Sequence, residues 1–429
     1  MVNTNGANGH DNGTKPPDDA LRNTLWEFAR KEYSIQMRID ELARLHNYHI
    51  KPRTLKNLNK KFEVPTVKKP PPLALATAYV AEKVAEDLTG RHGPSTIKKQ
   101  LARQENPILL PRSVFHDTVR ALQTAIDPEG AAARFPGRKR PVKVRGQLTA
   151  KGIMEEVHCD GHEKLGRKAL RMGLAGIDIY GFRDHPGKVL YLTVLPNARN
   201  QIAIGHVYLD FLEVNGEFPE QLTFDGGTET GPMKIVQQEL RRCLDPDFSE
   251  LQHPSTVSMS STDNIVVESL WKYWLDYAGQ NIKTAILQGP ERGFAQENTV
   301  HIHLFHWLWP KIVQQELDKF KYHFNTTRRR KQANKLLPTE APEYVFNNPE
   351  KFNLERLGTP VSKDFIAGLR ARLAKPRDEV MRWVPDVFDE LALQAYEVLE
   401  SPPLHFTTGW STFFSLLPLV ESEYVSSDM

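Results

Sequence analysis

A run of alternating strand and helix patterns, which begins near residue 153, restricts the fold of this 429-residue chain more than any other feature. Short apolar and β-branched stretches between turn signals predict strands at residues 155–160, 174–182, 188–196 and 221–225. Apolar spacings of three and four predict helices at 201–214, 232–244 and 264–277, with a short segment near 252–257 before the last helix. Turn residues at 185–187 indicate a hairpin, so the first three strands should be antiparallel neighbours. The order predicts an α/β domain over residues 151–335, with a mixed sheet flanked by helices.

The N-terminal part has a different, all-helical pattern. Residues 1–19 are rich in Asn, Gly and Asp and are expected to be a disordered tail. Residues 20–67 fit helices joined by a tight turn, the last of them basic, which is the pattern of a helix-turn-helix unit. Arg53 and Lys56 on that last helix are therefore candidate DNA contacts. Many helical hairpins share this pattern and bind nothing, so that alternative stays open.

A Pro-rich stretch at residues 68–73 separates this unit from a second helical, helix-turn-helix-like unit at 74–130, which a basic linker at 131–150 follows. Another basic run follows the predicted core. Further candidate DNA contacts lie in these two runs: Arg138, Lys139, Arg140, Arg328, Arg329 and Arg330. Each run reads equally well as a solvated surface or linker. The remaining residues, 336–429, have helical patterns and no recognisable chemistry.

Composition excludes several classes of protein. Two cysteines cannot build a disulfide framework or a four-cysteine zinc site, and no apolar run is long enough to span a membrane. Without a secretory signal at its start, the chain is expected to be soluble and not secreted. No phosphate-binding glycine loop appears, so no nucleotide cofactor is expected. The histidines of HIHLFH at residues 301–306 alternate with large apolar residues, which favours a helix packed on the core over a zinc site.

Three acidic residues occupy informative positions in the α/β pattern. Asp160 ends the first predicted strand, Asp225 ends the fourth, and Glu268 lies on the last helix. Each acid alone reads as a turn or surface residue. Together they could converge where the first and fourth strands lie side by side. Three converging carboxylates are suited to hold two Mg²⁺ or Mn²⁺ ions for phosphoryl transfer.

Four motifs around these acids resemble those of integrase-core proteins of transposon descent, a fungal type related to retroviral integrases and carrying a DDE motif. DGHEKL at 160–165 is similar to that family's D-G-x-x-K-L, and IYGFRD at 179–184 to its I-H-G-x-x-D. DGGTETG at 225–231 is similar to D-x-G-T-E-N-G, and STDNIVVESLW at 261–271 to S-T-R-N-x-R-I-E-R-L-W. The resemblance spans about residues 90–345.

The resemblance implies an RNase H-like core that carries out DNA integration as a polynucleotidyl transferase. Asp160, Asp225 and Glu268 would be its catalytic residues and the ligands of two Mg²⁺ or Mn²⁺ ions. It implies DNA as partner and a homo-oligomer. We expect such a protein in the nucleus, or in the cytoplasm before nuclear entry.

The chain also departs from the family pattern around the glutamate. Asp263, Val266 and Ser269 stand where the family has arginines, and Thr230 replaces the asparagine after the glutamate of D-x-G-T-E-N-G. Arginines at such places hold phosphate or brace the helix. Their loss favours an alternative, a domesticated DNA-binding protein derived from an integrase with impaired catalysis. A third hypothesis is an RNase H-type nuclease acting on hybrids.

Overall fold

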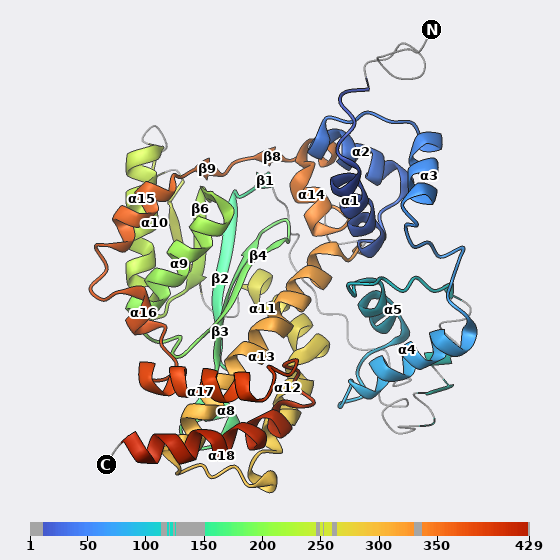
Figure 1. Cartoon of the computed structure of the whole chain (residues 1–429). Helices are drawn as coiled ribbons and strands as arrows, with labels where there is room; N and C mark the ends of the chain where they lie inside the picture. The colour runs from blue at the N-terminus through green and yellow to red at the C-terminus, as the bar shows by residue number, and fades with distance from the viewer. Residues whose placement is uncertain are drawn as a thin grey trace, which may run out of the picture. The chain divides into compact units, whose positions relative to one another are not determined.

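The structure, a computed structural model, describes residues 12–112, 118–119, 121–122, 125, 151–245, 249–251, 253–259, 264–329 and 337–427. The chain forms two compact units, Met1–Lys139 and Arg140–Met429 (Figure 1). The basic residues Arg138, Lys139, Arg140 and Arg330 lie outside the described residues. Most of the predicted helix after residue 112 also lies outside them.

The first unit is helical, as its apolar spacing predicts. Its helices are α1 (Asp18–Arg30), α2 (Ile35–His46), α3 (Pro52–Lys61), α4 (Leu73–Ala85) and α5 (Pro94–Ala102). Ser34 caps α2 by accepting a hydrogen bond from the Met37 amide, and Asn47 ends it in the left-handed conformation. The guanidinium of Arg30 donates to the carbonyls of Gln104 and Glu105, which joins α1 to the segment after α5.

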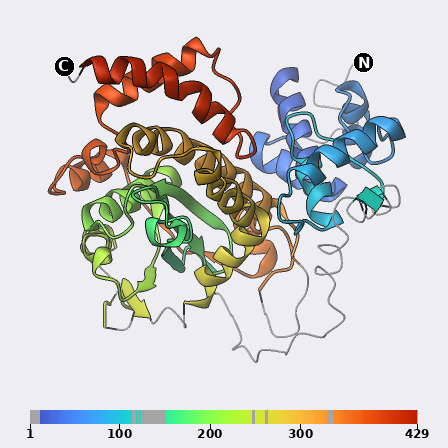
Figure 2. The same ribbon diagram turned by 90° about the horizontal axis from the view of Figure 1, so that it is seen from below.

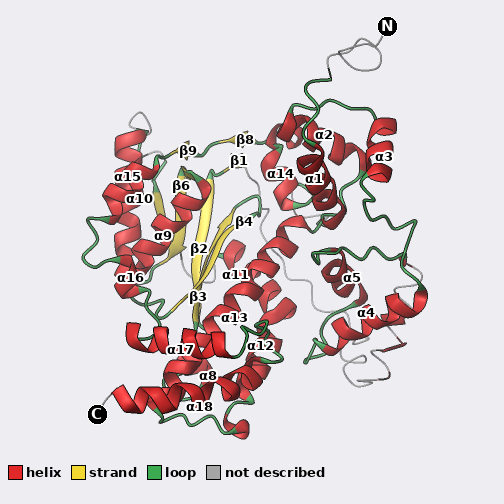
Figure 3. Cartoon of the chain, in the orientation of Figure 1, coloured by secondary structure: helices red, strands yellow, loops and turns green. Residues whose placement is uncertain are grey.

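The second unit contains a mixed five-stranded sheet, with strands in the order β4-β3-β2-β6-β7 (Figure 3). The strands are β2 (Glu156–His162), β3 (Asp178–Asp184), β4 (Val189–Leu195), β6 (Gln221–Asp225) and β7 (Thr256–Met259). β3 is antiparallel to β2 and β4, whereas β6 is parallel to both β2 and β7. The predicted α/β class and mixed sheet are confirmed. The second strand begins at Asp178 rather than at 174, because Gly173 has a φ of +62° and starts a turn there.

Helices cover both faces of this sheet. One apolar cluster joins the sheet to α9 (Gln201–Asn215) and α10 (Gly231–Leu244), and the other joins it to α11 (Ile265–Trp274), α12 (Gln280–Leu287) and α13 (Thr299–Thr326). β2 alternates between them: Val157 and Cys159 are fully buried in the first cluster. The intervening residues of β2 are polar and lie on the side of α11. Shorter helical elements are α8 (Arg167–Leu170), η1 (Thr228–Thr230), η2 (Leu275–Gly279), η3 (Pro290–Arg292) and η4 (Pro349–Phe352).

The segment after residue 337 packs onto the same unit. Its helices are α14 (Pro342–Asn347), α15 (Lys363–Arg370), α16 (Arg377–Val380), α17 (Asp386–Val398) and α18 (Gly409–Ser427). β8 (Glu355–Arg356) pairs with β1 (Gly152–Ile153), and β9 (Thr359–Pro360) pairs with β5 (Glu217–Phe218). α18 lies along α13, as Figure 2 shows, and Phe388 and Phe413 enter the apolar cluster on the α11 side.

The histidines of HIHLFH lie on α13, as predicted for a helix packed on the core. Two of these histidines are buried and accept hydrogen bonds from backbone amides. His301 Nδ1 accepts from the Ala295 amide, and His306 Nε2 accepts from the Gly176 amide. None of the helices in the described part of the chain is both long and apolar enough to cross a membrane.

Asp184 at the end of β3 is a fully buried acid and gives the first prediction. Its Oδ1 accepts from the Met154 amide at 2.9 Å, and its Oδ2 has no partner among the described residues. Burial raises its pKa from 3.8 to about 7. The folded state therefore keeps a proton that the unfolded state loses between these values, so this group lowers stability as pH rises through that window.

We expect Asp184→Asn to remove this penalty, because the amide keeps the acceptor and carries no charge. The unfolding free energy of the variant relative to the original chain should improve by about 2 kcal/mol between about pH 4.5 and about pH 8, measured by chemical denaturation. Asp386→Asn, a change at an exposed acid on α17, is the matched control. If the unfolding free energies of the two variants changed with pH in parallel, the pH dependence would not come from the buried Asp184.

Candidate active site

Asp160 and Asp225 lie on neighbouring strands. β2 and β6 run parallel with His158 opposite Thr223, and continuing this register by two residues brings Asp160 opposite Asp225. Glu268 lies in the first turn of α11, which packs on β2. The carboxylates of Asp225 and Glu268 both act electrostatically on Asp160. The structure thus brings together the three acids that the sequence singled out.

Asp160 has the most perturbed environment of the three. Burial, together with the charges of Asp225 and Glu268, raises its pKa from 3.8 to about 7 against the opposing hydrogen bond from the Trp271 indole. That indole Nε1 donates to Asp160 Oδ2 at 2.8 Å, and the Gly161 amide donates to Oδ1 at 2.8 Å. The two donors orient the carboxylate, while the neighbouring charges leave it in need of a cation.

Trp271 holds its place through the sheet below it. Its ring stacks on His162 with centroids 4.8 Å apart. Gly181 of β3 is the residue paired with Asp160 of β2. A Cβ on Gly181 would lie 2.9 Å from the Trp271 ring and 2.7 Å from Leu192. A glycine at this position therefore leaves the space that the indole fills.

The loop after β6 is tied to the loop after β2 by one arginine. Arg199 pairs with Glu163 at 2.7 Å and with the buried Glu229 at 2.9 Å. The Gly227 amide donates to Asp225 Oδ1, and a Cβ on Gly227 would lie 2.4 Å from the Glu229 carboxylate. The glycine, the glutamate and the arginine thus fix the turn that presents Asp225.

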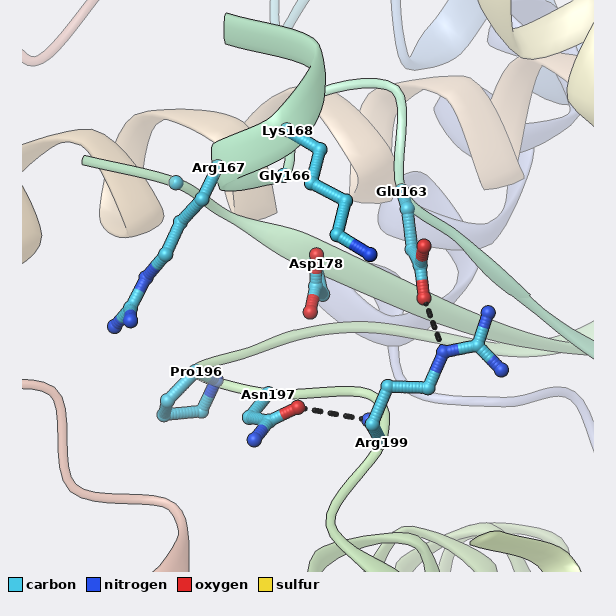
Figure 4. Close-up of a pocket in the computed structure, with 9 residues that line it drawn as sticks. Glu163, Gly166, Arg167, Lys168, Asp178, Pro196, Asn197 and Arg199 are labelled. Atoms are coloured by element: carbon cyan, nitrogen blue, oxygen red, sulfur yellow. Dashed lines mark hydrogen bonds and ion pairs between the residues drawn. The ribbon is translucent and has the colours of Figure 1, made fainter. Parts of the chain in front are cut away.

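A hollow of about 470 Å³ lies beside this turn (Figure 4). Its lining residues are Glu163, Gly166, Arg167, Lys168, Gly176, Asp178, Pro196, Asn197 and Arg199. In Figure 4 the side chain of Lys168 extends toward Glu163 and Asp178, whereas Arg167 points away from them. Burial raises the pKa of Asp178, although the Ala198 amide donates to it at 3.0 Å. The lining thus combines the cations of Arg167, Lys168 and Arg199 with two acids, and Arg199 is already paired with one of them, Glu163.

A second cluster of polar side chains lies toward the N-terminal end of β2. Glu156, His158 and His185 contact one another, and Thr223 Oγ1 donates to Glu156 at 2.7 Å. Burial opposes ionisation of Glu156, but the hydrogen bonds from the two histidines outweigh it and lower its pKa. His158 also bonds to Asn264, the residue before α11. Both polar groups of β2 are thus linked to the helix that carries Glu268.

The carboxylate site and this second group differ as metal sites. Within the described residues, Glu156, His158 and His185 are the set whose donor atoms all lie within 4.8 Å of one another. The carboxylate oxygens of Asp160, Asp225 and Glu268 do not all lie within 4.8 Å of one another, so these three acids are more widely spaced. Its all-oxygen donor set and the raised pKa of Asp160 fit hard divalent cations. Two ions about 3.5 to 4 Å apart would span the wider spacing.

The remaining candidate DNA contacts have different surroundings. Arg53 and Lys56 are exposed on α3. Arg328 is exposed and pairs with Glu340 at 2.8 Å. Arg329 donates to the carbonyls of Pro186 and Gly187 at 2.8 and 2.6 Å, and its burial lowers its pKa to about 10. Arg329 therefore braces the turn between β3 and β4.

Sequence reasoning missed the residues that support the three acids. Trp271 is three positions after Glu268 on the same helix, and this spacing could have placed both side chains on the face toward Asp160. Arg199 and His158 had no comparable signal, because their partners come from other strands and loops. Cys159, next to Asp160 on β2, is buried and free.

The indole hydrogen bond gives a second prediction. Trp271→Phe removes the donor to Asp160 and keeps an aromatic ring over His162, so the pKa of Asp160 should rise further. At pH 7 a rise of about one unit lowers the ionised fraction about fivefold, and Mn²⁺ affinity should fall by the same factor and recover at about pH 9. Calorimetric titration with Mn²⁺ measures this.

Trp274→Phe is the matched control, because the buried Trp274 indole N–H has no hydrogen-bond partner among the described residues. It should leave Mn²⁺ affinity unchanged. Equal losses in the two variants would show that the hydrogen bond does not tune Asp160.

Comparisons with known proteins add no relative to these observations. A scan against models of known protein families finds no match, and a search of curated proteins finds no significant relative.

Proposed function

We propose that this chain is a polynucleotidyl transferase of the DDE integrase type, with an RNase H-like core in which Asp160, Asp225 and Glu268 hold two Mg²⁺ or Mn²⁺ ions. The observation that carries the proposal is the convergence of these three acids. It depends on the sheet order β4-β3-β2-β6-β7, which places the first and fourth strands of the core side by side. The four ordered sequence motifs support the same function.

The chemistry follows from the donor set. When bound, two divalent ions activate the attacking water or 3′ hydroxyl and stabilise the leaving oxygen of a phosphodiester. The chain's own residues prepare that site: Trp271 orients the Asp160 carboxylate, and Arg199 fixes the turn of Asp225 through Glu229. The cations lining the neighbouring hollow are suited to hold a phosphate of the substrate near the acids.

DNA is the proposed substrate and partner. The first unit presents Arg53 and Lys56 on the exposed side of α3, the last helix of its helix-turn-helix-like part. A nuclear location and action as a homo-oligomer belong to the same proposal, because integration takes place on chromosomal DNA and joins two ends.

A second candidate function, an integrase-derived DNA-binding protein without turnover, has one observation in its favour. Around Glu268 the helix lacks the arginines of the family pattern. Arg183 of β3 instead donates to the Val266 carbonyl and to Ser269 Oγ, the latter at 2.7 Å. Arg183 is buried, so it braces α11 and leaves no guanidinium there for DNA phosphate.

A strand-transfer assay separates these functions. The full chain should cleave and join duplex DNA only with Mg²⁺ or Mn²⁺, and Asp160→Asn, Asp225→Asn or Glu268→Gln should each reduce the rate at least about 100-fold. Asp386→Asn, which neutralises an exposed acid of α17, is the matched control and should retain activity. Absence of metal-dependent activity in the unchanged chain would exclude the transferase. Cleavage of RNA–DNA hybrids alone would favour a nuclease.

DNA binding is tested separately from catalysis. Because Arg53 and Lys56 would contact phosphates, Arg53→Ala and Lys56→Ala should each weaken duplex binding for all sequences and reduce the salt slope of the affinity by about one. Fluorescence anisotropy at several salt concentrations gives both values. Lys15→Ala removes a lysine that pairs with Asp18 in the same unit and should leave the slope unchanged. An unchanged slope in the α3 variants would contradict the assignment.

A further inference from the structure

Glu156, His158 and His185 form a compact polar cluster outside the carboxylate site. Glu156 and His158 are on β2, and His185 follows β3. His158 Nε2 lies 3.0 Å from His185 Nδ1 and 3.3 Å from Glu156 Oε1, and His185 Nδ1 lies 3.2 Å from Glu156 Oε2. Three residues that commonly bind transition metals thus place their donor atoms within 4.8 Å of one another.

These separations match the geometry of a coordinated metal. In a tetrahedral site with metal–ligand bonds of about 2.0 to 2.1 Å, neighbouring ligand atoms are about 3.3 Å apart. The observed separations of 3.0, 3.2 and 3.3 Å are close to this value. The cluster therefore needs little rearrangement to receive an ion.

The surrounding residues prepare the donor atoms. Asn264 Nδ2 donates to the Cys159 carbonyl, which turns Asn264 Oδ1 toward His158 Nδ1 at 2.9 Å. His158 Nδ1 then donates to Asn264 Oδ1, which directs Nε2 toward the cluster. Thr223 orients Glu156 in the same way. Outer contacts that set the tautomer of a histidine and the direction of a carboxylate are typical of metal sites.

The cluster is largely shielded from water. The side chains of Glu156, His158 and His185 are only 20, 4 and 13% exposed. A largely buried carboxylate gains from a nearby cation, and a metal ion held by the two imidazoles would supply that charge.

We propose that Glu156, His158 and His185 bind one transition-metal ion of the Zn²⁺ type, with water at the open position. Two imidazoles and one carboxylate favour such an ion over Mg²⁺, which prefers oxygen ligands. The ion has a positioning role: His158 holds Asn264, whose carbonyl accepts from the amide of Glu268 at 3.1 Å at the start of α11. The site is separate from the carboxylate site and does not depend on the proposed function.

Co²⁺ reports this site directly, because its visible absorption is intense only in four- or five-coordinate sites. The full chain, freed of metal with a chelator, should bind one Co²⁺ with such a band, and Zn²⁺ should displace it. His185→Ala and Glu156→Gln should abolish the band and weaken Zn²⁺ binding about 100-fold or more. Asn264→Ala should weaken it about tenfold and keep the stoichiometry.

Two controls keep this test independent of folding and of catalysis. His303→Ala removes a histidine of α13 and should leave the Co²⁺ band intact. Asp225→Asn should also retain the band, even though it abolishes strand transfer. Circular dichroism checks that each variant is folded. A missing band in the folded original chain, or a band that persists in folded His185→Ala, would overturn the proposal.

Discussion

β2 and β6 lie side by side because α9 carries the chain across one face of the sheet and returns it parallel to its first strand. This pairing brings Asp160 and Asp225 together from distant parts of the sequence. The buried residues of α9, among them Phe211 and Leu212, belong to the same apolar cluster as Val157 of β2 and Leu222 of β6. The apolar face of the sheet therefore fixes the positions of the acids on its other face.

The opposite face is unusual because it buries polar groups under α11. Such groups are tolerated only when each finds a partner. Asp160 accepts a hydrogen bond from the Trp271 indole, and His158 bonds to Asn264, the residue before α11. Residues at both ends of α11 therefore supply hydrogen-bond partners to the buried polar groups of β2. Arg183 adds a third connection to α11. The position of α11 is thus set by directional contacts as well as by its apolar residues, and these contacts also fix the backbone that carries Glu268.

The sequence located the strands along the chain and singled out the three acids because both depend on local patterns. Apolar periodicity marks strands and helices, and an acid at the end of a strand is visible without tertiary information. The start of β3 was misplaced because Leu174 and Ala175 continue the apolar pattern through a turn that Gly173 makes possible. Contacts such as Arg199 with Glu229, or His185 with Glu156, join segments whose proximity only the fold creates.

The pairing of β1 with β8 and of β5 with β9 has a consequence for synthesis. A chain made from its N-terminus exposes β2, β6 and α11 long before β8, β9 and α18 exist. Until those late segments emerge, part of the apolar surface on both faces of the sheet has no cover and the core resembles a folding intermediate. A ribosome-bound chain would therefore lack a rigid acidic centre until the segment that forms β8, β9 and α18 has emerged.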